Sequence, residues 1–101
     1  MDYSINNSGN RTTINMSGRL TFDDQGNFKQ LLKELADDGA EKWLLDISGL
    51  EYIDSAGLGL MLRAQSVAEK AGKSMSMRVP QSGQVAEILE IAQFQTLIPT
   101  E

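Results

Sequence analysis

The segment EYIDSAGLGL, residues 51–60, holds the residues whose types and spacing most suggest chemistry. Ser55 stands between an aspartate and a small residue, and glycines follow at positions 57 and 59. A serine in this setting can serve as a nucleophile, as part of a phosphate-binding loop, as a helix cap or as a site of covalent modification.

Catalysis by Ser55 lacks its partners. The chain has no histidine and no cysteine, and Ile53 stands where the G-x-S-x-G elbow of α/β-hydrolases needs its first glycine. A Ser-Lys pair has no local partner either, because no lysine lies between Lys42 and Lys70. We therefore expect no enzymatic activity.

The two glycines do not form a phosphate-binding loop of the Walker type, because no lysine follows Gly59. The N–H groups at a helix start can still attract an anion, so a weak nucleotide site stays open as an alternative. Without cysteine or histidine there is no zinc–thiolate or histidine metal site. We expect neither a cofactor nor a metal ion.

Capping and modification remain as roles for Ser55. A serine N-cap stabilises a helix by about 1 kcal/mol, and Asp54 could cap instead. A phosphate on Ser55 would carry about −1.5 to −2 charges, which a helix N-terminus favours by roughly 0.3–1 kcal/mol and which Asp54 opposes. Because these effects offset, phosphorylation should leave the fold intact and change the surface potential, as in a binding switch.

Length and composition limit the class of protein. The chain has 101 residues, 41% of them apolar, which is typical of one globular domain spanning residues 1–101. Its net charge is −5 and its nine basic residues are scattered, so we expect no direct nucleic-acid binding. No apolar run approaches the roughly 18–20 residues that span a bilayer, and no signal peptide is visible. We expect a monomeric cytoplasmic protein that does not bind a membrane.

Strand-like patterns occur in three places in the first half of the chain. Residues 3–5 and 12–16 alternate between apolar and polar types and are separated by a turn signal, which predicts a hairpin. The apolar run 43–47 predicts a strand buried on both faces. Gly18 and Gly49 are expected to end the second and third strands.

A helical stripe lies between these strands. Apolar residues recur at helical spacing from Phe28 to Ala36, which predicts one buried face. Asp23 and Asp24 are expected to cap this helix, and Gly39 is expected to stop it.

The second half alternates helices and strands. We expect a helix over 56–71 that stops at Gly72, a strand over 75–79, a helix capped by Ser82 and a short last strand over 96–98. The order β-β-α-β-α-β-α-(β) predicts an α/β fold with a mixed, mostly parallel sheet covered by helices. The first two strands form its antiparallel N-terminal hairpin.

Two leucines leave the buried face of the helix over 56–71. At 100° per residue, Leu58 lies at the edge of that face and Leu62 lies nearly opposite. Single exposed leucines are common in soluble proteins. Leu62 is therefore either a lone surface residue or part of a docking patch beside Ser55.

The segment DISGLEYIDSAGLG, residues 46–59, resembles the signature of STAS domains, in particular the single-domain anti-sigma factor antagonists of bacteria. The likeness extends to Gly18-Arg19-Leu20 and to residues 85–90, and it covers almost the whole chain in order and spacing. It implies a STAS-like mixed sheet with the key serine at the start of the second helix.

The resemblance also implies a function. In this family the serine is phosphorylated by a GHKL-type serine kinase that is itself an anti-sigma factor. The unphosphorylated protein binds this partner, phosphorylation abolishes the binding, and a PP2C-type phosphatase restores the serine. Carried onto this chain, the phosphorylation site is Ser55, and the protein is a partner-switching phosphoprotein in bacterial signal transduction and transcription regulation.

The partner surface implied by the resemblance surrounds Ser55. It comprises Asp23, Asp24, Asp54, Ser55, Ala56, Gly57, Leu58, Gly59 and Leu62. Ala56 departs from the family, which often has a second hydroxyl residue there. Ala92-Gln93-Phe94 replaces a glycine-containing turn after the third helix.

Three other functions stay open. Some STAS relatives regulate biofilm or secretion programmes instead of sigma factors, and a nucleotide-binding STAS module is also possible. Asp46 or Asp54 could alternatively be the phosphorylated aspartate of a receiver-like domain. That domain would need acidic residues at the end of the first strand and a late lysine, which this chain does not supply there.

Overall fold

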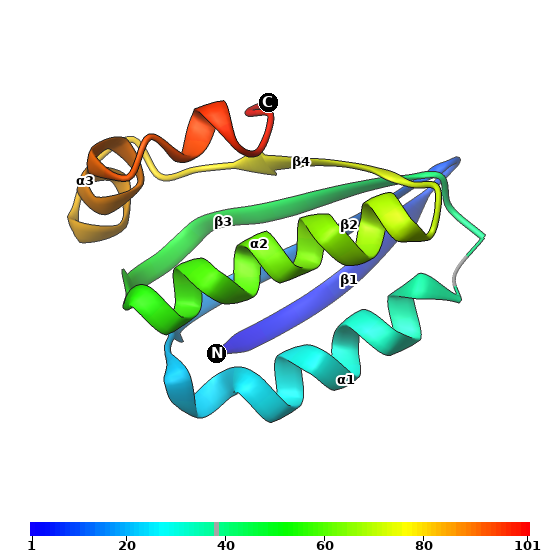
Figure 1. The fold of residues 1–101 in the computed structure, drawn as a ribbon, viewed down its shortest axis with the longest axis horizontal. Coiled ribbons are helices and arrows are strands. Elements are labelled where there is room, and N and C mark those ends of the chain that lie inside the picture. The colour runs from blue at the N-terminus through cyan, green and yellow to red at the C-terminus, as the bar shows by residue number, and fades with distance from the viewer. Residues whose placement is uncertain (38) are drawn as a thin grey trace.

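The computed structural model describes residues 1–37 and 39–101, and these form one four-stranded sheet with helices (Figure 1). The strands follow the order β1-β2-β3-β4 across the sheet. Their bounds are β1 Asp2–Ser8, β2 Arg11–Leu20, β3 Lys42–Ile53 and β4 Ser74–Arg78. The β1–β2 pair is antiparallel, whereas β2–β3 and β3–β4 are parallel. The predicted mixed sheet with an antiparallel N-terminal hairpin is confirmed.

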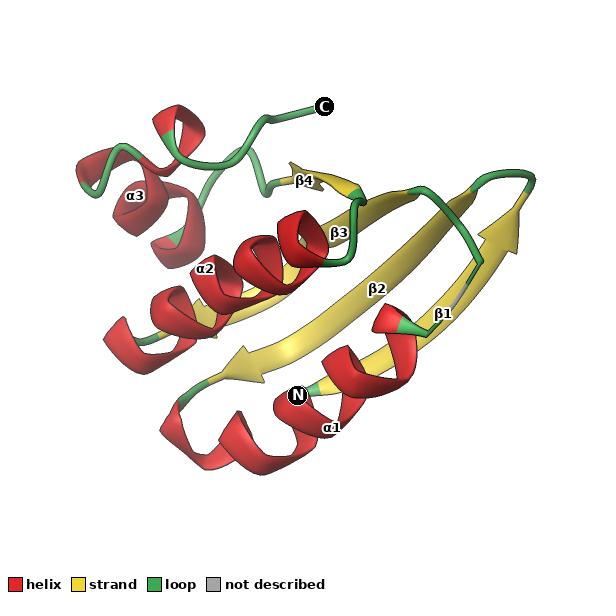
Figure 2. Ribbon diagram, turned by 45° about the vertical axis from the view of Figure 1, so that its right-hand side comes forward, coloured by secondary structure: helices red, strands yellow, loops and turns green. Residues whose placement is uncertain are grey.

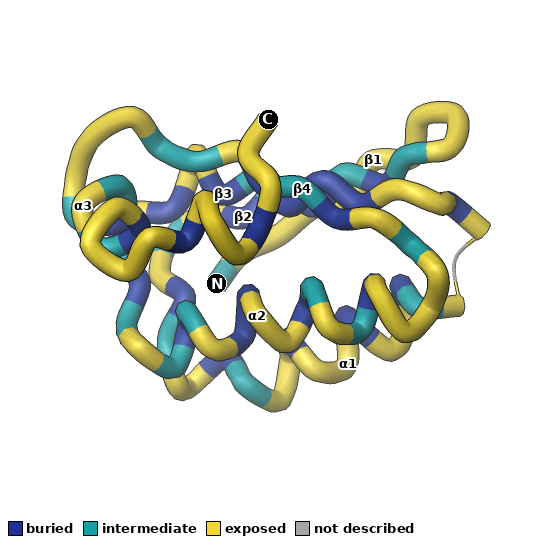
Figure 3. The backbone as a smooth tube through the Cα atoms, turned by 45° about the horizontal axis from the view of Figure 1, so that its top comes forward, coloured by how far each residue is buried: buried dark blue, intermediate teal, exposed yellow. Residues whose placement is uncertain are grey.

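The two longest helices lie side by side on one face of the sheet (Figures 1 and 3). A third helix and a 3-10 turn lie past the end of β4, and this third helix packs beside the last part of β3 (Figure 2). The helical elements are η1 Phe22–Asp24, α1 Gln25–Ala36, α2 Ser55–Lys70, α3 Gln84–Ile91 and η2 Phe94–Thr96. Within the described ranges, no helix is long and apolar enough to cross a membrane.

The core lies between the sheet and the helices α1 and α2. Trp43, Leu45 and Ile47 of β3 are almost fully buried there, with Phe28 of α1 and Met61 of α2. These positions follow the period of two in the strand and the helical spacing in α1 and α2, so the apolar pattern accounts for which faces meet. Burial of this face is the main source of stability for both helices.

Gly18 and Gly49 do not end their strands, contrary to prediction. β2 runs on to Leu20 and β3 to Ile53. Both glycines lie at irregularities of the β2–β3 register. Gly18 has a φ of 82°, and a Cβ on Gly49 would lie 3.0 Å from the Met16 carbonyl oxygen. The glycines therefore allow the two strands to stay paired through these irregularities.

The predicted stop of α1 and the predicted N-cap of α3 were also wrong. α1 ends at Ala36, before Gly39. The N-cap of α3 is Gly83, not Ser82, with a φ of 95° that glycine adopts without strain. Helix α2 ends at Lys70, one residue earlier than expected, and Gly72 follows with a φ of 74°.

The expected strand over 96–98 is absent, because the chain turns there instead. The N–H groups of Leu97 and Ile98 both donate to the Phe94 carbonyl, which closes a 3-10 turn. Ile98 is fully buried by this turn. A single parallel bridge then joins Thr100 to Met77 of β4. The apolar residues at 96–98 therefore reflect burial of a turn. So short an apolar run does not distinguish a buried turn from a strand.

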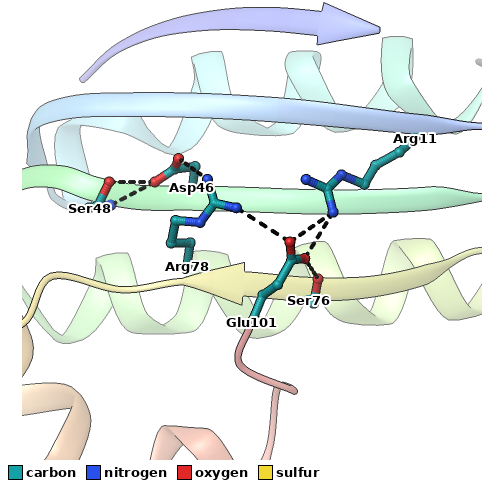
Figure 4. Close-up of polar contacts among 6 residues, drawn as sticks. All are labelled: Arg11, Asp46, Ser48, Ser76, Arg78 and Glu101. Atoms are coloured by element: carbon teal, nitrogen blue, oxygen red, sulfur yellow. Dashed lines mark hydrogen bonds and ion pairs between the residues drawn. The ribbon is translucent and has the colours of Figure 1, made fainter. Parts of the chain in front are cut away.

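The face of the sheet away from α1 and α2 carries a polar network (Figure 4). Glu101 accepts from Arg11 at 2.8 Å and from Arg78 at 3.3 Å, and Arg78 also pairs with Asp46 at 3.3 Å. The Asp46 carboxylate accepts from the Ser48 hydroxyl at 2.6 Å. Burial raises the pKa of Asp46, but its bonds to Ser48 and the Arg78 charge outweigh burial and hold that pKa below the ordinary value.

Gln84, the first residue of α3, bonds to the backbone of β3 where β4 no longer pairs with it. Its side-chain amide accepts from the Ile53 N–H at 3.0 Å and donates to the Ile53 carbonyl at 2.9 Å. The last paired residue of β3 on the β4 side is Asp46. Gln84 thus takes the place of a missing strand neighbour and satisfies the end of β3 just before Asp54.

Asp46→Asn tests the network on the polar face. Because the folded-state pKa of Asp46 is lowered, its contribution to stability is present above about pH 4 and is lost as the pH falls through the folded-state pKa. We expect the variant to be less stable than wild type by about 1 kcal/mol at neutral pH, with the difference shrinking at lower pH. Urea unfolding across this pH range measures it, with Asp23→Asn as an exposed control. A pH-independent difference would contradict the prediction.

Gln84→Glu tests the link between α3 and β3. The carboxylate cannot donate to the Ile53 carbonyl, and it places a charge beside that oxygen. We expect the free energy of unfolding to fall by about 1–3 kcal/mol, as for a half-buried polar group that loses its partner. Gln81→Glu, on the exposed loop before α3, is the matched control and should change stability little. Equal losses in both variants would exclude the proposed role of Gln84.

Candidate functional site

Asp54 caps α2, which decides between the two capping residues that the sequence left open. One carboxylate oxygen of Asp54 accepts from the Gly57 N–H at 2.7 Å. The other accepts from the Phe22 N–H at 3.2 Å. The Asp54 N–H in turn donates to the Leu20 carbonyl at 3.3 Å. The same carboxylate therefore starts α2 and ties it to the turn that follows β2.

Ser55 is the first residue of α2 and is exposed. Its hydroxyl has no hydrogen bond to another described residue, because the capping position is occupied by Asp54. The long β3 strand and its partner β2 hold this helix start at the carboxyl end of the sheet (Figure 1). A modification of the hydroxyl would leave the cap in place.

The two glycines after Ser55 have different environments. Gly57 is buried, and a Cβ there would clash with the Leu20 carbonyl oxygen and lie 2.6 Å from Ile53 Cγ1. Gly59 is exposed, and a Cβ there would meet nothing within 4 Å. Close packing against β2 explains Gly57. No contact among the described residues explains Gly59, whose cost within a helix is about 0.5–1 kcal/mol relative to alanine.

The two acids before α1 are also unlike each other. Asp23 is exposed. Asp24 is buried and closes a capping box around η1 with Thr21, whose N–H donates to its carboxylate at 2.8 Å. The Met1 amine donates to the same carboxylate at 2.8 Å. Neither acid caps α1 with its side chain, contrary to expectation, because that of Asp24 is occupied by the preceding turn.

The pKa of Asp24 reflects these contacts. Burial raises the pKa of its carboxyl, but the Met1 amine and the bonds with Thr21 outweigh burial and hold the pKa below the ordinary value. Asp24 is therefore a charged structural residue of the turn that supports Asp54 through Phe22.

The nine residues of the expected partner surface divide by exposure. The four exposed residues are Asp23, Ser55, Gly59 and Leu62. The three half-buried residues are Asp54, Ala56 and Leu58, and the two buried residues are Asp24 and Gly57. The buried and half-buried aspartates and Gly57 hold the site together. The exposed members are available to a partner.

Phe22 was missed by the sequence reasoning. Its side chain is 64% exposed, and its N–H binds the carboxylate that caps the helix of Ser55. Leu62, further along α2, is 38% exposed. An aromatic residue directly before Asp23 and Asp24 was the available signal, but only the bond to Asp54 shows that it lies beside α2.

The comparison with protein families matches residues 3–99 to the model described as "Mlab, STAS domain". Several solved structures share the fold. A putative anti-sigma factor antagonist from Thermotoga maritima has a TM-score of 0.83 at 17% identity, covering 97% of this chain and 84% of that one. An anti-sigma factor antagonist from Mycobacterium paratuberculosis has a TM-score of 0.76 at 14% identity, covering 98% and 83%.

The unphosphorylated form of the anti-sigma factor antagonist SpoIIAA has a TM-score of 0.69 at 17% identity, covering 92% of this chain and 83% of that one. At these identities the likeness is one of fold. No curated protein matches the chain.

Gly57→Ala and Gly59→Ala form a matched pair that separates the two glycines. We expect Gly57→Ala to lower the free energy of unfolding by about 1–3 kcal/mol, because backbone atoms of β2 block the added methyl group. Gly59→Ala should raise it by about 0.5–1 kcal/mol, since the site is open and helical. Urea unfolding of both variants measures the difference, and effects of the same sign would contradict the packing described for Gly57.

Proposed function

This chain belongs to the STAS family, whose model described as "Mlab, STAS domain" matches residues 3–99, and on that premise we propose that it is a phosphorylation-switched binding protein. Its unphosphorylated form binds a GHKL-type serine kinase that acts as an anti-sigma factor. Phosphorylation of Ser55 abolishes that binding, and a PP2C-type phosphatase reverses the modification. The protein itself is a regulator and not an enzyme.

The free hydroxyl of Ser55 is the observation that carries this proposal. Asp54 supplies the cap of α2, so the exposed hydroxyl has no structural duty among the described residues. A kinase can reach it without unfolding the helix start. Phosphorylation would also leave both Asp54 bonds, to Gly57 and Phe22, intact.

The charges at the helix start suit a binding switch. A phosphate at the first position of α2 gains roughly 0.3–1 kcal/mol from the helix N-terminus. The Asp54 carboxylate is fixed next to it in sequence and opposes it. The fold therefore changes little in stability, while a surface that includes exposed Phe22 and Leu62 gains about −1.5 to −2 charges. An apolar partner surface would lose affinity for it.

Gly59 supports the same surface. It is exposed on the face of α2 that carries Ser55 and Leu62, and no described residue packs on it. A glycine kept inside a helix at a cost in stability fits a partner backbone that must approach closely. Together with Asp23 and Phe22, these residues form the proposed docking surface.

A second candidate keeps the switch and changes the output. The matching family model is described by its STAS domain, and the description names no sigma factor. The partner in this alternative is a regulator of another pathway, such as biofilm or secretion control. A nucleotide-binding STAS module is the remaining alternative, which calorimetry with ATP and GTP tests directly.

Ser55→Asp tests the proposed switch against the GHKL-type serine kinase encoded nearest to this gene. We expect the wild-type protein to bind this kinase. The Ser55→Asp variant should bind it with an affinity at least about tenfold lower, which corresponds to about 1.4 kcal/mol. After incubation with the kinase and ATP, mass spectrometry should find phosphate on Ser55 only.

Ser66→Asp is the matched control. It adds the same charge at an exposed position of the same helix, about 16 Å further along the helix axis. We expect it to bind the kinase nearly as tightly as wild type. Phosphate on another residue, or equal binding by wild type and Ser55→Asp, would sink the phosphoswitch.

A further inference from the structure

A groove runs between α1 and α2 on the surface away from the sheet. The two helices lie side by side in both ribbon views (Figures 1 and 2). The groove has a volume of about 680 Å³, and both helices contribute to its lining. It lies on the flank of α2 and does not include Ser55 or its neighbours.

The rim of this groove is basic although the chain is acidic. Lys29 and Lys33 line it from α1, and Arg63 lines it from α2. All three side chains are exposed, and none is ion-paired with another described residue. Three of the nine basic residues of a chain with net charge −5 thus gather here, and Asp37 is the one acidic residue that lines the groove within the described ranges.

Apolar side chains lie between the basic ones. Leu32 is buried, and Ala36 and Val67 are half-buried, so they form the deeper part of the groove. The groove therefore offers an apolar floor with cations on both sides. Helix α1, with 12 residues, provides a wall about 18 Å long.

We propose that this groove binds an acidic amphipathic helix of a partner protein. Lys29 and Lys33 are one helical turn apart, so they match two carboxylates at the same spacing on a helix lying along α1. The apolar face of that helix covers Leu32 and Val67. From the other side of the groove, Arg63 pairs with a carboxylate of the same helix. Such a helix-in-groove contact combines apolar burial with complementary charge.

This surface is separate from the proposed phosphorylation site. Ser55 lies at the first position of α2, and Leu62 of the proposed docking surface does not line the groove, whereas Arg63 and Val67 line it from the second half of α2. One partner helix can thus occupy the groove whether or not Ser55 is modified. The acidic surface elsewhere on the chain repels such a helix, so the basic rim of the groove is the place where its charge is complemented.

The experiment uses a labelled amphipathic peptide of about 12 residues, which spans about 18 Å as a helix. It carries leucines on one face and glutamates one turn apart along the edges of that face, and a second peptide has glutamine in place of every glutamate. Fluorescence anisotropy measures the affinity of each for the whole chain, and amide chemical shifts of the labelled protein locate the contact. We expect binding of the acidic peptide, with shifts along α1 and the second half of α2.

The double variant Lys29→Glu/Lys33→Glu should weaken binding of the acidic peptide by about tenfold or more, or about 1.4 kcal/mol. Arg19→Glu/Lys42→Glu makes the same charge change on the sheet, outside the groove, and should weaken it by less than about threefold. Binding should also fall as salt is raised from about 0.05 to about 0.3 M. Thermal melts check that both double variants are folded.

Three results would overturn the proposal. The first is equal affinity of the glutamine peptide, or no binding of the acidic one. The second is an equal effect of the two double variants. The third is tighter binding of phosphatidylglycerol vesicles or a single-stranded oligonucleotide through the same lysines. Ser55→Asp should leave peptide affinity unchanged, so failure here is distinct from failure of the phosphoswitch.

Discussion

The Asp54 carboxylate is the contact on which the candidate site depends. Its two oxygens hold the N–H groups of Gly57 and Phe22, which belong to segments far apart in the sequence. Through the first bond it starts α2, and through the second it fixes the turn after β2 against that helix. Because a different residue supplies the cap, the adjacent Ser55 is exposed, and its hydroxyl has no hydrogen bond within residues 1–37 and 39–101. The cap of the helix and the exposed hydroxyl thus belong to two neighbouring residues.

The long central strand β3 positions Asp54 at the start of α2. β3 continues past Gly49 to Ile53, and Gln84 satisfies both backbone groups of Ile53 where β4 no longer pairs. The backbone of β2 comes so close to α2 that residue 57 must be glycine. The helix start is thus held from three sides, by β2, by α3 and by the turn that contains Phe22. Under the proposed function, a frame of this kind would allow a charge at Ser55 to change binding without changing the fold.

Charge is distributed unevenly over the molecule. The polar face of the sheet balances its own charges, since Arg11, Arg78, Asp46 and Glu101 pair with one another. The groove between α1 and α2 leaves its cations facing solvent. Net charge alone suggested only an acidic surface, because it cannot say which charges cancel locally. The fold turns scattered lysines and an arginine into one basic rim.

The sequence by itself determined the order of elements, the mixed sheet, the buried faces of α1 and α2 and the position of Ser55 at a helix start. These follow from periodicity and local residue types, which act over a few residues. The tertiary structure decided which residue caps α2, why Gly57 and Gly59 differ, and that Phe22 lies beside α2. It also decided that Gly18 and Gly49 lie within strands and that residues 96–98 form a turn. The roles of Gly49, Gly57 and Phe22 depend on neighbours distant in sequence, such as the Leu20 carbonyl above Gly57, and local patterns contain no information about such neighbours.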